Sequence, residues 1–99
     1  MKQPLDIRFL GMDASPALEA AAQEKAAKLD RVCPHVMACR VTIELEHKHK
    51  QQGRPIAVRI DVTVPGRELT VDRVQDEDAY VALREAFDDM QRQVQAAKK

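Results

Sequence analysis

The residues best spaced to do chemistry are three cations, Lys25, Lys28 and Arg31, which follow one another at intervals of three. On an α-helix each such step turns about 300°, so the three side chains cover about 120° of one helix surface. A ridge of this kind suits contact with the phosphates of a nucleic-acid backbone. It is also typical of a solvated helix face, since Glu24 and Asp30 stand near enough to neutralise it. Spacing alone leaves both interpretations open.

A second group of positive charges lies between His47 and Arg59, in a stretch that contains no acidic residue. Gly53 and Pro55 give this stretch the composition of a loop. A basic loop could contact phosphate without reading bases, but a solvent-exposed loop needs charge in any case, so composition favours neither role. The cations of the stretch are Lys48, Lys50, Arg54 and Arg59.

Metal-binding and thiol motifs are poorly developed. His47 and His49 lie two apart and could share a strand face, but no further ligand stands at the spacing of a metal site. Cys33 and Cys39 have five residues between them, which fits neither a CxxC redox motif nor a zinc motif. We expect reduced thiols, with Cys39 as a small buried hydrophobic residue. The sequence predicts no metal and no cofactor.

Residues for catalysis are equally sparse. Asp88 and Asp89 are adjacent, so on a helix they point about 100° apart and do not converge as an acid and base pair. Ser15 is the only serine, and the 3 glycines form no phosphate-binding loop. We therefore expect a protein that is not an enzyme.

Length and charge limit the choice further. The 99 residues suffice for one domain, expected over 1–99, and 16 basic residues balance 16 acidic ones, so no overall positive field marks a general polyanion binder. No apolar run approaches the roughly 20 residues of a membrane span, and the start of the chain lacks the pattern of a signal peptide. We expect a cytoplasmic protein without a membrane partner.

Alternation and helical spacing place the elements that would carry these residues. Alternating apolar residues predict strands over 5–9, 40–46, 56–64 and 68–74. Ser15 and Pro16 are typical of a helix start, and Pro34 limits that helix to about residue 32. Carboxylates over 76–78 precede a second helix, whose predicted apolar stripe is Tyr80, Leu83, Phe87, Met90 and Val94.

The order βαβββα predicts an α+β fold. The first two strands should be parallel and the later hairpins antiparallel, giving a four-stranded mixed sheet. Each strand has only one apolar face, so both helices should pack on the same side. The other side should present Arg8, Arg40, Thr42, Arg59, Asp61 and Thr70 to solvent.

Read in order, several segments resemble the ribosome hibernation-promoting factor family, also called sigma-54 modulation or S30AE proteins. The resemblance spans nearly the whole chain. Among family members, the chain resembles the short form, which is without the C-terminal domain by which longer members pair ribosomes. That family has the same βαβββα fold, similar in outline to double-stranded-RNA-binding domains. The segments that carry the resemblance are 15–18, Lys25, 28–29, Arg31, His35, 64–69, 77–80 and 82–83.

The resemblance implies a function. Family members enter the messenger and transfer RNA channel of the small ribosomal subunit and stop translation during stress or stationary phase. The implied partner is therefore the small subunit with its 16S rRNA, with no DNA partner, and a monomer is expected. Lys25, Lys28 and Arg31 match the family's basic first-helix residues, and Arg8 and Arg92 fall where basic residues are usual. With the loop, the candidate RNA-binding residues are Arg8, Lys25, Lys28, Arg31, Lys48, Lys50, Arg54 and Arg92.

The second helix departs from the family pattern. Asp89 stands where family members commonly carry lysine, and Ala96 and Ala97 replace further basic residues. The stretch 72–89 carries 7 acids against Arg73 and Arg84, a balance of 2 − 7 = −5. The alternative interpretation is therefore a diverged paralogue that acts as a regulatory protein-interaction domain without binding ribosomes.

Overall fold

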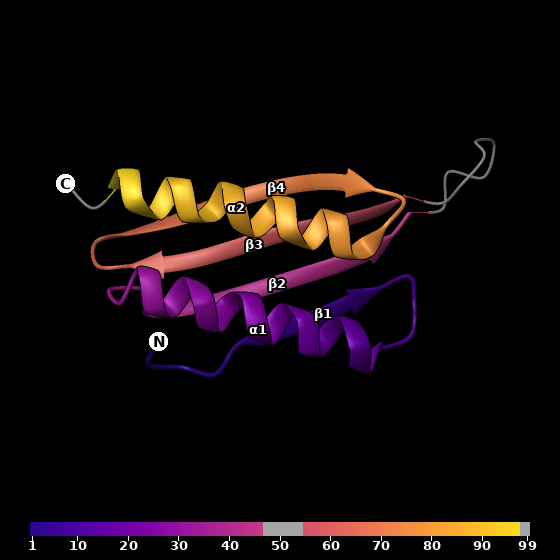
Figure 1. The fold of residues 1–99 in the computed structure, drawn as a ribbon, viewed down its shortest axis with the longest axis horizontal. Helices are drawn as coiled ribbons and strands as arrows, with labels where there is room; N and C mark the ends of the chain where they lie inside the picture. Colours follow the sequence, from indigo (N-terminus) through magenta and orange to yellow (C-terminus); the bar gives the residue numbers. More distant parts are fainter. Residues whose placement is uncertain (47–54, 98–99) are drawn as a thin grey trace.

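The protein folds as one four-stranded sheet with two helices on one of its faces (Figure 1). The structure is a computed structural model that describes residues 1–46 and 55–97. In sheet order the strands are β1-β2-β3-β4. In chain order the elements are β1 (Asp6–Leu10), α1 (Pro16–Val32), β2 (Ala38–Leu45), β3 (Ile56–Val64), β4 (Arg67–Asp76) and α2 (Ala79–Ala97).

Strand pairing confirms the predicted mixed sheet. β1 runs parallel to β2, whereas β2 with β3 and β3 with β4 are antiparallel. α1 and β3 have the bounds that the sequence predicted, while β1 is shifted by one residue and β4 is longer at both ends. The differences lie at strand ends, where pairing with a neighbour rather than hydrophobic alternation decides the last residue.

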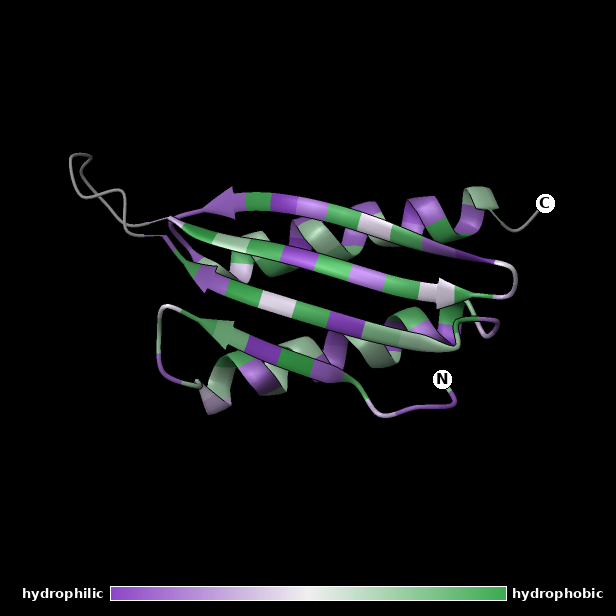
Figure 2. Ribbon diagram, turned by 180° about the vertical axis from the view of Figure 1, so that it is seen from behind, coloured by the Kyte–Doolittle hydropathy of each residue, from purple (hydrophilic) through white to green (hydrophobic). Residues whose placement is uncertain are grey.

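The hydrophobic core fills the single layer between the sheet and the helices. Viewed from behind, the strands alternate between apolar and polar residues and no helix covers them (Figure 2). β3 shows the rule most clearly, since Val58, Ile60 and Val62 are fully buried while Arg59 between them is exposed. The helices contribute the buried residues Leu18, Ala22, Ala26 and Leu29 from α1, and Ala82, Leu83, Ala86, Phe87, Met90 and Val94 from α2.

Tyr80 corrects the predicted apolar stripe of α2, because its side chain is 49% exposed. α2 begins only at Ala79, and Tyr80 is turned about 60° from Leu83, at the edge of the stripe. Ala79 packs against the core instead. The fold therefore leaves one aromatic ring at the surface near the start of α2.

Both helices begin at a side chain that accepts a backbone hydrogen bond. The Ser15 hydroxyl accepts from the Leu18 N–H at 3.2 Å, and Pro16 occupies the first turn, where no N–H is required. The Asp78 carboxylate accepts from the Tyr80 N–H at 2.9 Å. One of the predicted carboxylates before α2, that of Asp78, therefore caps the helix directly. Neither helix, within the part of the chain that the structure describes, is long and apolar enough to cross a membrane.

A β-bulge in β4, which the sequence did not reveal, changes which residues face the helices. Val71 pairs with Ile60 and Val74 with Val58, so two residues, Asp72 and Arg73, lie opposite one on β3. Arg73 adopts the left-handed conformation, with φ +62°. Unbroken alternation from Val71 would have turned Arg73 towards the core. The extra residue instead lets Val74 pack against the core.

We expect Ser15→Ala to lower the free energy of unfolding by about 1 kcal/mol, because the Leu18 N–H loses its acceptor. In a domain of this size that corresponds to a fall of about 4–8 °C in Tm. Urea and thermal unfolding would measure it. Ser15→Asp, which keeps an acceptor at this position, is the matched control and should stay close to the original stability. Equal losses in both variants would contradict the capping role.

Candidate nucleic-acid interface

The three cations at the C-terminal half of α1, which we call the basic ridge (Lys25, Lys28 and Arg31), are placed by the buried side of their own helix. Ala26 and Leu29 are turned into the core. Their burial leaves Lys28 and Arg31 exposed and Lys25 half-buried. A rise of 1.5 Å per residue separates the first and last ridge positions by about 9 Å along the helix axis. The ridge is therefore a short, outward-facing line of positive charge.

The basic ridge is free of neutralising partners among the described residues: no carboxylate oxygen lies within 4.0 Å of its nitrogen atoms. Asp30, which the sequence suggested as a neutralising neighbour, instead accepts from the α-ammonium group of Met1 at 2.6 Å. Glu24 forms no ion pair with the ridge either, within the described chain. The positive charge of the ridge remains available to an external anion.

Arg8 and Arg92 lie apart from the basic ridge and are already paired. Arg8 is on the opposite, open face of the sheet, where its guanidinium donates to Asp6 at 3.3 Å. Arg92 forms an ion pair with Asp89 one turn away on α2. An anion that binds either arginine must share it with a carboxylate. Lys48, Lys50 and Arg54 lie outside the described residues.

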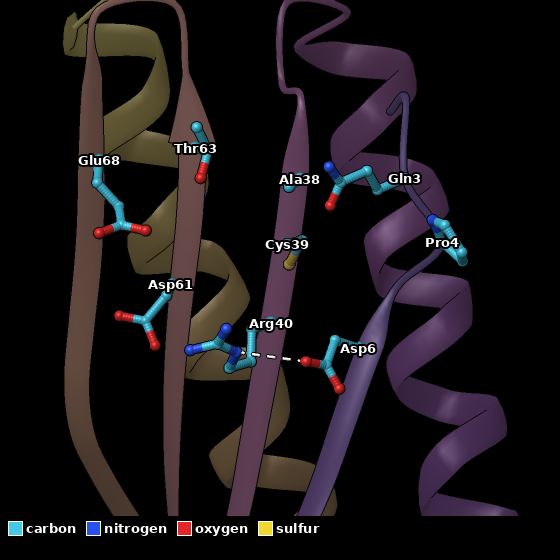
Figure 3. Close-up of a pocket in the computed structure, with 9 residues that line it drawn as sticks. All are labelled: Gln3, Pro4, Asp6, Ala38, Cys39, Arg40, Asp61, Thr63 and Glu68. Atoms are coloured by element: carbon cyan, nitrogen blue, oxygen red, sulfur yellow. Dashed lines mark hydrogen bonds and ion pairs between the residues drawn. The ribbon is translucent and has the colours of Figure 1, made fainter.

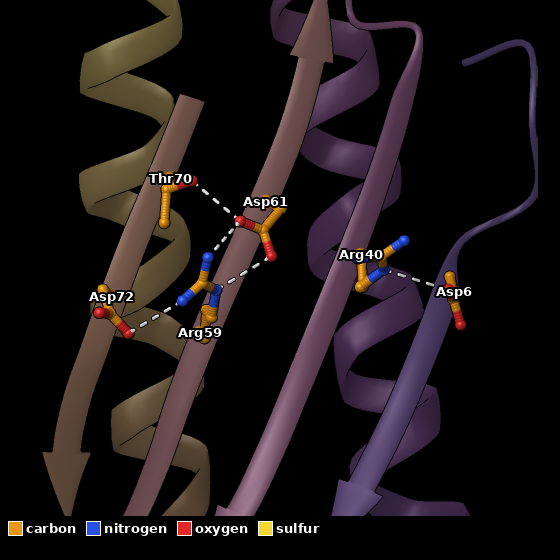
Figure 4. A network of polar contacts seen from close by, with 6 residues as sticks. All are labelled: Asp6, Arg40, Arg59, Asp61, Thr70 and Asp72. Carbon is orange, nitrogen blue, oxygen red and sulfur yellow. Dashed lines mark hydrogen bonds and ion pairs between the residues drawn. The ribbon is translucent and has the colours of Figure 1, made fainter. Parts of the chain in front are cut away.

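The open face of the sheet carries charges that neutralise one another (Figure 4). Arg59 donates two hydrogen bonds of 3.2 Å to Asp61, and it lies 3.7 Å from Asp72. Arg40 donates to Asp6 at 3.3 Å. The predicted solvent-facing positions are thus confirmed. Their arginines, however, serve the sheet itself, which makes this face a poor phosphate site.

The Asp61 carboxylate accepts several hydrogen bonds on the open face. Partial burial acts to raise the pKa of its carboxyl group. Hydrogen bonds from Arg59 and from the Thr70 hydroxyl, the latter at 2.8 Å, outweigh this effect, so the pKa lies below its usual range. The carboxylate therefore stays ionised and keeps Arg59 in place at neutral pH.

Two hollows open on the same face, and both have mixed charge. One of about 90 Å³ lies between the N-terminal segment and the sheet, with Arg40 held by Asp6 at its rim and Asp61 and Glu68 on the other side (Figure 3). The other, of about 190 Å³, has Arg59 and Asp72 among its walls. Neither combines unpaired cations in the way that the basic ridge does.

A buried acid links the described residues on either side of 47–54. The Glu46 N–H donates to the Pro55 carbonyl at 3.1 Å. The Glu46 side chain is buried, accepts from the Gln75 amide at 3.0 Å and forms an ion pair with Arg73. The β4 bulge therefore also supplies the cation that compensates this carboxylate.

Neither of the two cysteines forms a disulfide, and both are buried, which the sequence predicted for Cys39. Burial, and to a lesser degree the negative charge of Asp61, raises the pKa of the Cys39 thiol to about 12. The group is therefore a neutral thiol at physiological pH and a poor nucleophile. No cluster of three or more His, Cys, Asp or Glu side chains suited to a metal ion occurs in 1–46 and 55–97.

The structure adds two residues to the surroundings of the basic ridge. Lys25 and Lys28 share a small hollow with Asp88 and Gln91 of α2, at the seam between the helices. From the sequence, Asp88 was only excluded from an acid and base pair with Asp89. Its proximity to the ridge depends on how α1 and α2 lie side by side, which no pattern within either helix reveals.

Comparison with known proteins shows which family the chain matches. Residues 5–99 match the family model described as sigma 54 modulation protein / S30EA ribosomal protein. No curated protein matches the chain significantly.

Two solved structures share its fold. A ribosomal subunit interface protein from Coxiella burnetii aligns with a TM-score of 0.78 and 18% identity, covering 95% of this chain and 96% of that one. The N-terminal domain of Thermus thermophilus Protein Y aligns with a TM-score of 0.79 and 22% identity, covering 97% of this chain and 100% of that one.

We expect the buried Cys39 thiol to make folding less favourable at high pH. In the unfolded chain the thiol ionises near its ordinary pKa of 9.0, whereas in the folded protein it stays protonated up to about 12. Stability is therefore fully present below pH 9 and falls as the pH rises towards 12. Urea unfolding across this range should show a shallower decline for Cys39→Ala than for the original chain. Parallel declines would contradict the assignment.

Proposed function

The chain belongs to the sigma 54 modulation protein and S30EA ribosomal protein family, and on this premise we propose that it binds the small ribosomal subunit and inhibits translation. In this proposal it occupies the channel for messenger and transfer RNA during stress or stationary phase, in the cytoplasm. It acts by occupying space and has no catalytic step. The family match over 5–99 supports the ribosomal partner, and the basic ridge supports contact with its RNA.

The single observation that carries the RNA contact is the unpaired state of the basic ridge. The ridge, formed by Lys25, Lys28 and Arg31, spans about 9 Å along the helix axis. This length suits contact with two or three neighbouring phosphates. A phosphate that binds there displaces no carboxylate of the described chain. Each contact releases counterions from the RNA, so binding should weaken steeply with salt.

The remaining candidate residues take a secondary place in this proposal. Arg8 and Arg92 each share their charge with a carboxylate, so a phosphate contact there gains less than one on the ridge. In this proposal Lys48, Lys50 and Arg54, which the sequence places in a predicted loop, extend the interface. Shape complementarity between a rigid protein and a folded RNA channel supplies the specificity that phosphate contacts lack.

The alternative function, a protein-interaction domain, has its support in α2. The outward side of this helix carries Glu85, Asp88 and Asp89. These acids would repel RNA and suit a basic protein surface. Ribosome binding requires the basic ridge, whereas contact between α2 and a basic protein does not.

We expect the chain to co-sediment with purified small ribosomal subunits at low salt and to be released as salt rises. The variant Lys25→Ala, Lys28→Ala, Arg31→Ala should bind more weakly. Its slope of log affinity against log salt should be shallower by about two to three, because up to three phosphate contacts are lost. A quantitative pelleting assay over a salt series measures both quantities.

The control variant removes the same amount of charge elsewhere: Arg40→Ala, Arg59→Ala, Arg67→Ala. Arg40 and Arg59 lie on the open face, and Arg67 lies at the start of β4. This variant should keep most of the salt slope. Equal slopes for the two triple variants would show that only total charge matters. Failure of the original chain to pellet at low salt would contradict the proposed function and favour the protein-interaction domain.

A further inference from the structure

The seam between α1 and α2 holds a hollow of about 30 Å³ that touches the basic ridge. This volume exceeds the roughly 10–15 Å³ that one water molecule needs, so a small polar group fits the hollow. The six residues around it are Lys25, Lys28, Leu29, Phe87, Asp88 and Gln91. A water molecule, or a small polar group carried on a larger molecule, can therefore enter it.

The lining of the hollow combines apolar and polar side chains. Its apolar part is buried, since Leu29 is 2% exposed and Phe87 is 5% exposed. Lys25 and Lys28 come from one helix, and Asp88 with Gln91 from the other. The rim therefore combines two cations with a carboxylate and a side-chain amide.

Asp88 lies beside the lysines without forming an ion pair with them. Among the described residues, no oxygen of Asp88 comes within 4.0 Å of a lysine nitrogen, although all three residues line the same hollow. The carboxylate is thus separated from the cations by the space of the hollow. A group placed there would meet acceptors on the α2 side and donors on the α1 side.

The chemistry of the rim selects the kind of group that fits. A carboxylate only accepts hydrogen bonds, so Asp88 repels a phosphate oxygen and attracts a donor. The lysines only donate, and the Gln91 amide does both. A hydroxyl group satisfies both sides, because it donates one hydrogen bond and accepts others. Phosphates on the outer part of the ridge and a hydroxyl in the hollow are therefore compatible.

We propose that the seam hollow binds a ribose 2′-hydroxyl of the RNA strand whose phosphates contact the basic ridge, with Asp88 as the acceptor that distinguishes RNA from DNA. The inference rests on the proposed contact between the ridge and RNA. The 2′-hydroxyl is attached within the same nucleotide as a phosphate, it is small enough to enter the hollow, and DNA lacks it. Asp88 then has a positive role in an otherwise phosphate-binding surface.

Two oligonucleotides that differ only in the 2′-hydroxyl test the proposal. Labelled oligouridylate and oligodeoxyuridylate of about 12 nucleotides are titrated with the chain at low salt, and binding is followed by fluorescence anisotropy. The original chain should bind the RNA about tenfold more tightly than the DNA, the effect expected for one hydrogen bond to a charged acceptor at a partly solvated site.

Two substitutions of Asp88 separate its charge from its hydrogen bond. Asp88→Ala removes both, so DNA binding should tighten while the RNA preference falls close to one. Asp88→Asn removes the charge and keeps an acceptor, so both oligonucleotides should bind more tightly with a clear RNA preference retained. Glu85→Gln removes the same charge from another exposed position of α2 and should leave the preference unchanged.

Three outcomes would overturn the proposal: no RNA preference in the original chain, an unchanged preference in Asp88→Ala, or no binding of either oligonucleotide. Thermal unfolding of each variant confirms that the fold is intact. The pelleting assay keeps the two proposals apart. If the chain pellets with small subunits and shows no preference that depends on Asp88, the seam inference fails while the proposed function stands.

Discussion

The structure depends on one constraint, which is that every strand has a single apolar face and both helices must cover the same side of the sheet. Val58, Ile60 and Val62 of β3 are fully buried under the helices, while Arg59 points to solvent on the other side. Covering the sheet fixes how α1 and α2 are rotated about their axes. Because Ala26 and Leu29 must face the core, Lys28 and Arg31 must face outward. The position of the basic ridge is therefore a consequence of core packing.

A net charge of zero conceals an unequal distribution of charge between the two sides of the molecule. On the open face, Arg8, Arg40 and Arg59 each lie beside an aspartate and are compensated. On α1, the cations of the ridge are uncompensated within the described chain, and Asp30 is occupied by the Met1 ammonium group. Electrostatic attraction for a polyanion is set by this local excess and not by the total. A neutral protein can thus present a locally positive surface on one helix.

The β4 bulge shows how an irregular feature serves the regular core. Arg73 accepts a left-handed backbone, with φ +62°, which is uncommon for a residue other than glycine. In return Val74 packs against the core, and the arginine forms an ion pair with the buried Glu46. That carboxylate also accepts from Gln75, so one cluster joins the end of β2 to β4. The sheet is therefore fastened at the end where β2 stops.

The sequence by itself determined the elements, their order and the composition of the core. Alternation predicted β3 over its full length, the Ser15-Pro16 pair predicted the start of α1, and helical spacing predicted Leu83, Phe87, Met90 and Val94 on the buried side of α2. Only the tertiary structure decided which charges are paired, because Arg40 and Asp6 are 34 residues apart in the chain and meet across two strands. It likewise decided the exposure of Tyr80, the bulge at Arg73 and the approach of Asp88 to the ridge. These features depend on distances between separate elements, whereas local patterns record only the face that each element turns to the core.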